Sequence, residues 1–326
     1  MADKPTVLLV EDSDDDLALA TLALAKTGWP HVLVPLRDGP EVFAYLYNGA
    51  RGTPPAMILL DLKLPKVDGK TALREVRGNP RTTRVPVVVL TSSSLEQDIT
   101  DSYTLGANSY LRKELDFPRF KASASILMAY WLGLNVPPPG LGAVAAQPHL
   151  LQGVSVADAF QEVLPRRAPA KLAPEIVIID ANPGDVRATL EGIAASSVRN
   201  PVRTVGTFQD MVDFLRPVGG PPPLLQRNFP RMFILDVDLR DGDGRDVLQA
   251  LRYRADHHAI IVMFTRKKDP MFISECYRLK VNSVVFKPDD PAAFRDTVRL
   301  IAHYWIHLNE PPPDQSWAAR AIAHPG

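Results

Sequence analysis

Five polar residues in the first half of the chain stand at or just past the ends of short apolar runs. They are Glu11, Asp12, Asp61, Thr91 and Lys113. Three carboxylates that converge raise each other's pKa unless a cation lies among them, and oxygen ligands with open positions suit Mg²⁺. A lysine and a hydroxyl can hold phosphoryl oxygens. The set indicates a site where a carboxylate attacks phosphorus and carries an acyl phosphate, while a metal ion and the lysine stabilise the developing charge.

Each of these residues also has an ordinary structural interpretation. An aspartate at a strand end is commonly a turn former, as is the pair Asp68-Gly69. Thr91 alone could cap a helix, and Lys113 alone could be a solvated charge. Because short motifs often match by chance, it is the joint occurrence of five such residues at strand ends that favours a functional site.

The elements that must position these residues are strands buried on both faces. Uniformly apolar runs cover residues 6–10, 31–36, 56–60, 85–90 and 108–111. They alternate with helical patterns, as in parallel sheets covered by helices. Five strands alternating with five helices predict a doubly wound α/β domain with a five-stranded parallel sheet. In such a domain the working site lies beyond the carboxyl ends of the strands.

The same pattern occurs twice in the chain. Asn108-Ser109 and Tyr130-Trp131 recur 174 residues later (282 − 108 and 304 − 130), and the second set of runs covers residues 175–179, 201–205, 231–235, 259–264 and 282–286. A period this long indicates two copies of one domain. We place the domains at residues 1–136 and 175–326, joined by a Pro- and Ala-rich linker at 137–174 with a short helix near 156–163. Ser13 with Asp16, and Asn182-Pro183, predict helix starts in the two copies.

The segments VLLVEDSDDD, ILLDLKLPKVDGK, VPVVVLTSSS and GANSYLRK resemble the receiver domain of bacterial two-component response regulators, and the resemblance covers both copies. It implies two flavodoxin-like receivers in tandem. It also implies that Asp61 is the phosphoacceptor and that Asp12 and Asp61 bind Mg²⁺ directly, with the backbone carbonyl of Lys63. Glu11 would complete the acidic pair.

The same resemblance makes Thr91 and Tyr110 a switch pair and Lys113 the lysine that contacts the phosphate. In this family the lysine normally precedes a proline, often through a cis bond, whereas Lys113 precedes Glu114. A cis bond before a non-proline residue costs about 2.5–4 kcal/mol. We therefore expect a trans bond here.

The second copy departs from the family pattern. It keeps Asp180, Asp236, Thr265 and Lys287-Pro288, but Ala181 replaces Asp12 and Val284 replaces the switch tyrosine. Asp238 lies two residues past Asp236, where the first copy has Lys63, and could restore part of the lost charge. Losing a direct carboxylate ligand weakens a Mg²⁺ site. We therefore expect a weak metal site at Asp180, Asp236 and Asp238, with Asp236 as a second candidate acceptor.

The endings YWLGLNVPPP and YWIHLNEPPP further resemble small regulators without an output domain that accompany bacterial phytochromes. This implies a sensor histidine kinase as partner, with a bacteriophytochrome among the candidates. It implies no enzymatic activity beyond self-catalysed phosphotransfer and autodephosphorylation. Two classes of function stay open: a phosphotransfer protein that signals through receiver or partner contacts, and a binding scaffold that no longer transfers phosphate. A metal-dependent hydrolase is less favoured, because no substrate pocket or acid–base partner is evident.

Composition bounds the setting of the protein. Lys plus Arg number 37 and Asp plus Glu number 37, and no helix-turn-helix or basic patch is evident, which argues against nucleic-acid binding. The single cysteine, Cys276, suits a reducing cytoplasm and falls in a helical stretch typical of core. No apolar run is long enough to span a membrane. His303 and His307 share a helical face but have no evident third metal ligand.

The last helix of each copy is apolar on more than one face. Trp131 and Trp305 each belong to a stripe that we expect to pack in the domain's own core, and Tyr130 and Tyr304 point about 100° away from them. We therefore expect the tyrosine faces to be covered by another protein surface. Pairing within one chain and pairing between two chains both fit, and we favour a homodimer.

Overall fold

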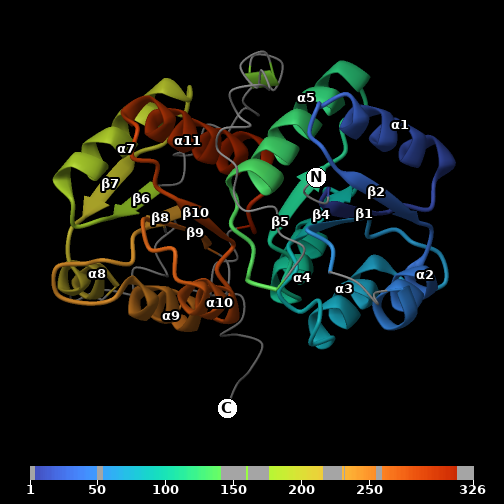
Figure 1. Cartoon of the computed structure of the whole chain (residues 1–326), viewed down its shortest axis with the longest axis horizontal. Coiled ribbons are helices and arrows are strands. Elements are labelled where there is room, and N and C mark those ends of the chain that lie inside the picture. Colours follow the sequence, from blue (N-terminus) through green and yellow to red (C-terminus); the bar gives the residue numbers. More distant parts are fainter. Residues whose placement is uncertain are drawn as a thin grey trace.

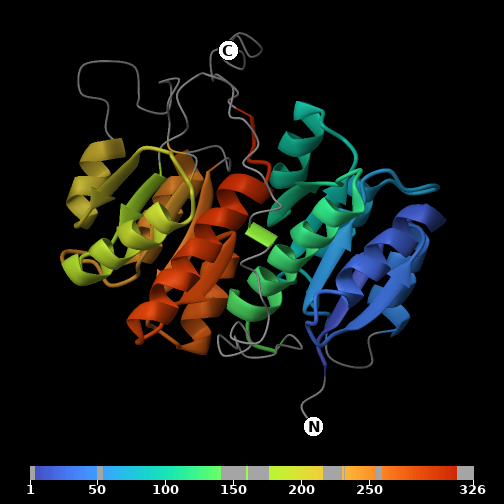
Figure 2. The same ribbon diagram turned by 90° about the horizontal axis from the view of Figure 1, so that it is seen from above.

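Two parallel sheets organise the chain. The computed structural model describes residues 4–49, 54–140, 159–160, 176–215, 230, 232–254 and 259–313. Within these residues lie two five-stranded sheets whose neighbouring strands all run parallel, and helices cover both faces of each sheet (Figures 1 and 2). The predicted doubly wound fold is confirmed for both copies, which are called the first and second domains below.

The first domain has the strand order β2-β1-β3-β4-β5. Its strands are β1 (Thr6–Val10), β2 (Val32–Leu36), β3 (Met57–Leu60), β4 (Val87–Thr91) and β5 (Ser109–Arg112). Its helices are α1 (Asp14–Ala25), α2 (Gly39–Ala44), α3 (Gly69–Gly78), α4 (Glu96–Thr104) and α5 (Phe117–Met128), with π-helical turns η1 (Tyr45–Gly49) and η2 (Ala129–Leu134). Every residue of β3 and β4 is buried, because helices lie on both faces of the sheet.

The second domain repeats this order as β7-β6-β8-β9-β10. Its strands are β6 (Ile176–Ile179), β7 (Val202–Val205), β8 (Met232–Leu235), β9 (Ile260–Thr265) and β10 (Ser283–Phe286). Its helices are α7 (Pro183–Ala195), α8 (Phe208–Leu215), α9 (Gly244–Arg254), α10 (Pro270–Arg278) and α11 (Pro291–His303), followed by the π-helical turn η5 (Tyr304–Leu308). The ten predicted runs match the ten strands to within a residue or two at each end.

Two capped helix starts bring further acidic residues to the strand ends. The side chain of Ser13 accepts a hydrogen bond from the backbone N–H of Asp16 at 3.3 Å, at the start of α1. The side chain of Asn182 accepts one from Asp185 at 3.4 Å, at the start of α7. Both predicted helix starts are confirmed. Asp16 and Asp185 thus lie in the first turn of the helix that follows the first strand of each domain.

The two domains pack against each other with an approximate twofold relation that follows the 174-residue repeat. The Asn108 side chain donates to the carbonyl of Asn282 at 3.0 Å, and the Asn282 side chain donates to the carbonyl of Asn108 at 3.0 Å. Strands β5 and β10 are the sheet edges on this side, and α5 and α11 meet at the centre of the molecule (Figure 2). The two halves therefore pair as a pseudo-dimer within one chain.

Four aromatic rings form the centre of this contact. Tyr130 and Tyr304 are fully buried and stack with ring centroids 4.4 Å apart. The indole of Trp305 donates to the Tyr130 hydroxyl at 2.7 Å, and that of Trp131 donates to the Tyr304 hydroxyl at 2.6 Å. The tyrosine faces are covered, as expected. One expectation is corrected, because the tryptophans share the interface instead of packing in each domain's own core. Of the two pairings that the sequence left open, the structure has the one within a chain, and a homodimer stays a prediction.

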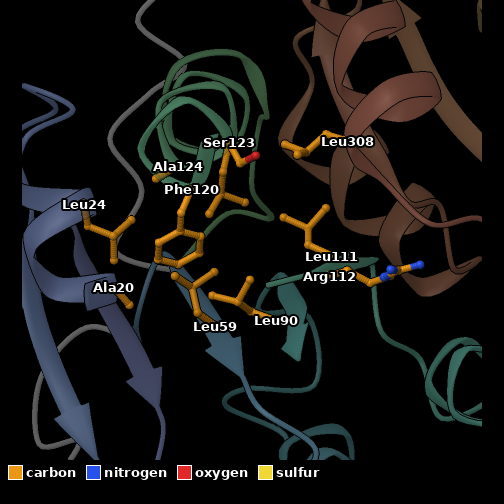
Figure 3. A pocket seen from close by; sticks show the side chains of 11 residues that line it. Ala20, Leu24, Leu59, Leu90, Leu111, Arg112, Phe120, Ser123, Ala124 and Leu308 are labelled. Atoms are coloured by element: carbon orange, nitrogen blue, oxygen red, sulfur yellow. The ribbon is translucent and has the colours of Figure 1, made fainter. Parts of the chain in front are cut away.

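The chain crosses to the other domain after each terminal helix. The backbone N–H of Val136 donates to the carbonyl of Val284 at 2.7 Å, and that of Glu310 donates to the carbonyl of Tyr110 at 2.8 Å. Leu308 of the second domain reaches the first domain beside α5, where it lines a cavity of about 10 Å³ with Leu111 and other apolar residues (Figure 3). That space holds about one water. It is a packing gap, too small for a ligand.

The linker contributes one described contact. Ala159 and Phe160 are helical, and the rest of the helix predicted near 156–163 lies outside the described residues. The Phe160 ring lies 4.3 Å from the ring of His303, and the guanidinium of Arg299 lies 4.8 Å from the Phe160 ring centroid. The linker therefore packs on α11 at this point.

Candidate functional site

Lys113 is the centre of the first acidic cluster. Its Nζ atom lies 2.6 Å from Glu11 Oε2, 2.6 Å from Asp61 Oδ2 and 2.8 Å from Asp16 Oδ2. Carboxylate oxygens of Glu11, Asp12 and Asp61 lie within 4.8 Å of one another. Strand order explains the convergence, because β3 lies between β1 and β4 and its end therefore faces theirs. Glu11 and Asp61 are buried and Asp12 is exposed, so the cluster opens to solvent on one side.

The charged groups of this cluster shift one another's pKa. Burial raises the pKa of Glu11, although Lys113 opposes that effect. Burial by itself would lower the pKa of Lys113, but hydrogen bonds to Asp16, Asp61 and Glu11 outweigh it and raise that pKa. The lysine therefore stays charged. Carboxylate oxygens with one solvent-facing side fit Mg²⁺, which keeps part of its water shell.

The loops around the cluster are tightly constrained. A Cβ atom on Gly69 would collide with the backbone carbonyl of Asp61, and one on Gly244 would collide with that of Asp236. The Asp68-Gly69 pair is thus more than a turn former, since only glycine lets the start of α3 approach the acceptor so closely. The bond between Lys113 and the next residue is trans, as predicted, and no cis bond occurs among the described residues.

Thr91 and Tyr110 are linked through one loop. Thr91 ends β4 and is fully buried, and its Oγ1 atom accepts a hydrogen bond from the backbone N–H of Ser93 at 3.4 Å. The Tyr110 hydroxyl donates to the carbonyl of Ser93 at 3.0 Å. Burial raises the pKa of Tyr110 to about 12, so its phenol stays neutral. The backbone N–H of Tyr110 donates to Asn309 Oδ1 of the second domain at 3.1 Å, which joins this loop to the domain interface.

The second domain builds a similar cluster around Lys287. Its Nζ atom lies 2.7 Å from Asp180 Oδ2 and 3.1 Å from Asp185 Oδ2, and it also contacts Asp236. Carboxylate oxygens of these three aspartates lie within 4.8 Å of one another. Burial raises the pKa of Asp180, against the attraction of Lys287. Thr265 ends β9 and is fully buried, like Thr91.

The membership of this second cluster differs from the prediction. Asp238 is exposed, and its backbone forms a bridge with Asp243 within the loop, so it is not among the three grouped aspartates. The third carboxylate is Asp185, and its counterpart Asp16 contacts Lys113. Sequence reasoning missed both residues. The signal was present in the capped helix starts, because each aspartate is the third residue of its helix.

Arg266 gives the second cluster another cation. Its guanidinium pairs with both carboxylate oxygens of Asp185, one of them at 3.1 Å. Burial by itself would raise the pKa of Asp185, but Arg266 and Lys287 hold it below its ordinary value. The first domain has Ser92 at the matching place, directly after Thr91.

The two clusters therefore differ in formal charge. In the first, four carboxylates surround one ammonium group, which leaves −3 (1 − 4). In the second, the three grouped carboxylates and Asp289, which lies 3.7 Å from Arg266, meet two cations, which leaves −2 (2 − 4). The first cluster keeps the larger negative charge to attract a divalent cation.

Other residues named from the sequence lie away from this chemistry. Cys276 is buried, and burial raises its pKa to about 12, so it is a poor nucleophile at neutral pH. His303 and His307 are buried, and the ring of His303 lies next to both Phe160 of the linker and the ring of His307, with ring centroids 4.3 and 4.8 Å away. Among the described residues, no helix has the length and apolar character needed to cross a bilayer.

Comparison with known proteins agrees with this geometry. The response regulator receiver domain family matches residues 7–125 and 176–299. Response regulator Rcp1 of Synechocystis sp. is 40% identical over 129 residues, which are 39% of this chain and 88% of that protein. A crystal structure of the phosphorylated cyanobacterial phytochrome response regulator RcpA is 39% identical over 40% of this chain and 95% of that chain, with a TM-score of 0.38. One of Mn²⁺-bound Rcp1 is 38% identical over 41% of this chain and 99% of that chain, with a TM-score of 0.38.

Proposed function

Because this chain belongs to the response regulator receiver domain family, we propose that its first domain accepts a phosphoryl group on Asp61 from a sensor histidine kinase. The observation that carries the proposal is the convergence of Glu11, Asp12 and Asp61 beside Lys113. A bacteriophytochrome is the proposed kinase class, since phytochrome response regulators are among the relatives. The proposed activity is limited to accepting this phosphoryl group and later losing it by autodephosphorylation.

The chemistry requires only the residues of this cluster and a metal ion. A carboxylate oxygen of Asp61 attacks phosphorus, a P–O bond forms, and the P–N bond to the kinase histidine breaks. Asp12, Asp61 and the carbonyl of Lys63 would hold Mg²⁺, which neutralises charge on the transferring group. Lys113 and Thr91 would hold phosphoryl oxygens after transfer. Burial of Asp61 keeps the acceptor in one orientation.

The signal is proposed to leave through the pairing of the two domains. A phosphoryl group that binds the Thr91 hydroxyl would compete with the hydrogen bond from the Ser93 N–H to that hydroxyl. The loop at Ser93 would then shift, and the Tyr110 hydroxyl, which donates to the Ser93 carbonyl, would shift with it. The backbone of Tyr110 also binds Asn309 and Glu310 of the second domain. A shift of this tyrosine therefore changes contacts at the interface, with protein contacts and not nucleic acid as the proposed output.

A second function is favoured for the second domain. Lys287 and Arg266 already neutralise half of the charge of its acidic cluster, and Ala181 stands where the first domain has Asp12. We infer that this domain acts as a scaffold, a receiver that transfers little or no phosphate and holds the first domain in its pairing. Asp236 is then a weak acceptor at most.

Phosphorylation from a small acyl phosphate donor tests both assignments. With Mg²⁺ present, the wild-type chain should incorporate label, and Asp61→Asn should reduce it by at least about tenfold, because the attacking oxygen is lost. The matched control Asp236→Asn should keep near wild-type labelling. Equal loss in Asp236→Asn, or label that survives in Asp61→Asn, would reverse the roles of the two domains.

A further inference from the structure

A groove of about 390 Å³ lies between the two domains. It is lined at the amino ends of β5 and β10 by Asn108 and Asn282, so it faces away from the acidic clusters at the carboxyl ends. Its remaining walls come from α3, α4, α9, α10 and the loops that follow them, on the lower side of the molecule in Figure 1. The volume falls in the range of small-molecule sites, roughly 300–1,000 Å³.

The charge of this groove has one sign. Among the described residues that line it, five are cationic and none is acidic: Arg77, Arg84, Arg252, Arg278 and Lys280. The chain as a whole carries equal numbers of acidic and basic residues. A cluster of five cations without a carboxylate is therefore a local feature, and it occurs where both domains contribute.

Two of these cations, the buried Arg252 and the half-buried Arg77, have no acidic partner among the residues that the structure describes. Arg77 donates to three backbone carbonyls and to the side-chain oxygen of Asn108. Arg252 donates to two backbone carbonyls and to the side-chain oxygen of Asn282. All these acceptors are neutral, so they fix the guanidinium groups but do not neutralise them. Burial lowers the pKa of both arginines to about 10, because no neighbouring carboxylate in the described part of the chain offsets the cost of removing the charge from water. Buried charges in proteins are normally paired.

The other three cations are accessible. Arg84 is half-buried, and Arg278 and Lys280 are exposed. Arg278 has a weak surface pair with Glu275 at 3.5 Å, which is outside the groove lining. These side chains can turn toward a ligand in the groove, where Arg77 and Arg252 would also attract its negative charge.

We propose that this groove binds a phosphate-bearing metabolite of nucleotide size, held by Arg84, Arg278 and Lys280. Guanidinium and ammonium groups are the usual protein ligands of phosphate, and several cations together favour an anion with more than one charge. Because residues of both domains line the groove, the ligand bridges them and stabilises their pairing. The proposal does not depend on phosphorylation of Asp61.

Calorimetric titration with inorganic pyrophosphate tests the site, with EDTA present so that no metal at the acidic cluster can recruit the anion. We expect saturable binding of one pyrophosphate per full-length chain. Arg84→Glu and Lys280→Glu should each weaken it by about tenfold or more, because each replaces an attraction by a repulsion. Pyrophosphate should raise the midpoint of thermal unfolding of the wild type, and it should raise that of the variant with both Arg84→Glu and Lys280→Glu by less.

Lys26→Glu is the matched control, because Lys26 is an exposed lysine at the end of α1, outside the groove. It should bind pyrophosphate as the wild type does. Equal weakening by Lys26→Glu would mean that only overall charge matters, and absence of one-to-one binding in the wild type would mean a groove filled by solvent. Citrate that binds as tightly as pyrophosphate would show a general anion site. Each of these three results overturns the proposal.

Discussion

The residue that follows the buried threonine is one of two differences in charge between the acidic clusters. Arg266 follows Thr265 and pairs with Asp185, whereas Ser92 follows Thr91 and brings no charge. The missing carboxylate at Ala181 is therefore only half of the difference between the domains. A divalent cation entering the second cluster would have to overcome an internal cation already in place.

Restoring both positions should restore metal binding to the second cluster. In a chain whose first cluster is weakened by Asp12→Ala, we expect Ala181→Asp with Arg266→Ser to raise Mg²⁺ affinity by about tenfold or more. The added carboxylate supplies a ligand, and loss of the guanidinium removes a competing charge. Titration of the full-length chain with Mg²⁺ measures it. If Ala181→Asp alone gave the same affinity as the double variant, Arg266 would have no part in excluding the metal.

The site residues that could be found from the sequence are those that end apolar runs. Glu11, Asp61 and Asp236 could be placed because a parallel sheet brings all its carboxyl ends to one edge. Asp16 and Asp185 were missed although their capped helix starts were predicted, because an acid in the first turn of a helix is also ordinary helix chemistry. Asp238 was wrongly assigned to the second cluster, because its distance in sequence from Asp236 does not show whether the loop turns its side chain toward the cluster or toward solvent.

At the scale of the elements, the terminal helices show how far an apolar pattern can be interpreted. Their second apolar faces predicted a further covering surface, and Tyr130 and Tyr304 are fully buried. The pattern could not say which surface covers them, because a twofold contact within a chain and one between chains need the same self-complementary residues. The crossing of residues 135–136 and 309–310 to the other domain left no periodic signal, since it rests on backbone hydrogen bonds.

The last helix of the second domain should make stability depend on pH. Burial lowers the pKa of His303 to about 3 and also lowers that of His307, from an ordinary value of 6.5. Below pH 6.5 the unfolded chain therefore binds protons that the folded chain does not. Stability is full above pH 6.5 and falls toward lower pH, by up to about 1.4 kcal/mol per pH unit for each histidine.

Urea unfolding between pH 7.5 and pH 5 measures this slope. In His303→Phe, whose ring can still pack on Phe160, the slope should be smaller than in the wild type by the share of one histidine. His31→Gln serves as a control, because His31 lies in the first domain, away from this helix. An unchanged slope in His303→Phe would show that carboxylates, and not this histidine, set the acid sensitivity.

At the scale of the whole molecule, the repeat is also the interface. Asn108 and Asn282, which lie 174 positions apart, bind each other, so two domains of unequal chemistry are held in a symmetric arrangement. The groove between them and the loop at Tyr110 both lie on this contact. A ligand or a phosphoryl group that changes either domain is therefore coupled to the pairing, which makes the strength of the pairing the quantity to measure.

Tyr130→Glu should open the pairing. Tyr130 is fully buried, stacks on Tyr304, donates to Ser283 and accepts from Trp305. A carboxylate there would be buried without a counter-charge and should cost at least about 3 kcal/mol. The indoles of Trp131 and Trp305 would become exposed to water, so the tryptophan fluorescence emission should shift to longer wavelength. Tyr253→Glu, at an exposed tyrosine on α9, is the control and should leave emission unchanged.

Sedimentation of the same proteins decides whether the pairing lies within the chain. Because the faces that would join two chains already cover each other, we expect the wild type to sediment as a monomer at micromolar concentration. Tyr130→Glu should then sediment more slowly for its mass, because two domains joined by a linker are less compact than a paired set. A wild-type dimer that Tyr130→Glu converts to monomer would instead mean that the domains exchange between chains, with each domain of one chain paired to its counterpart in the other.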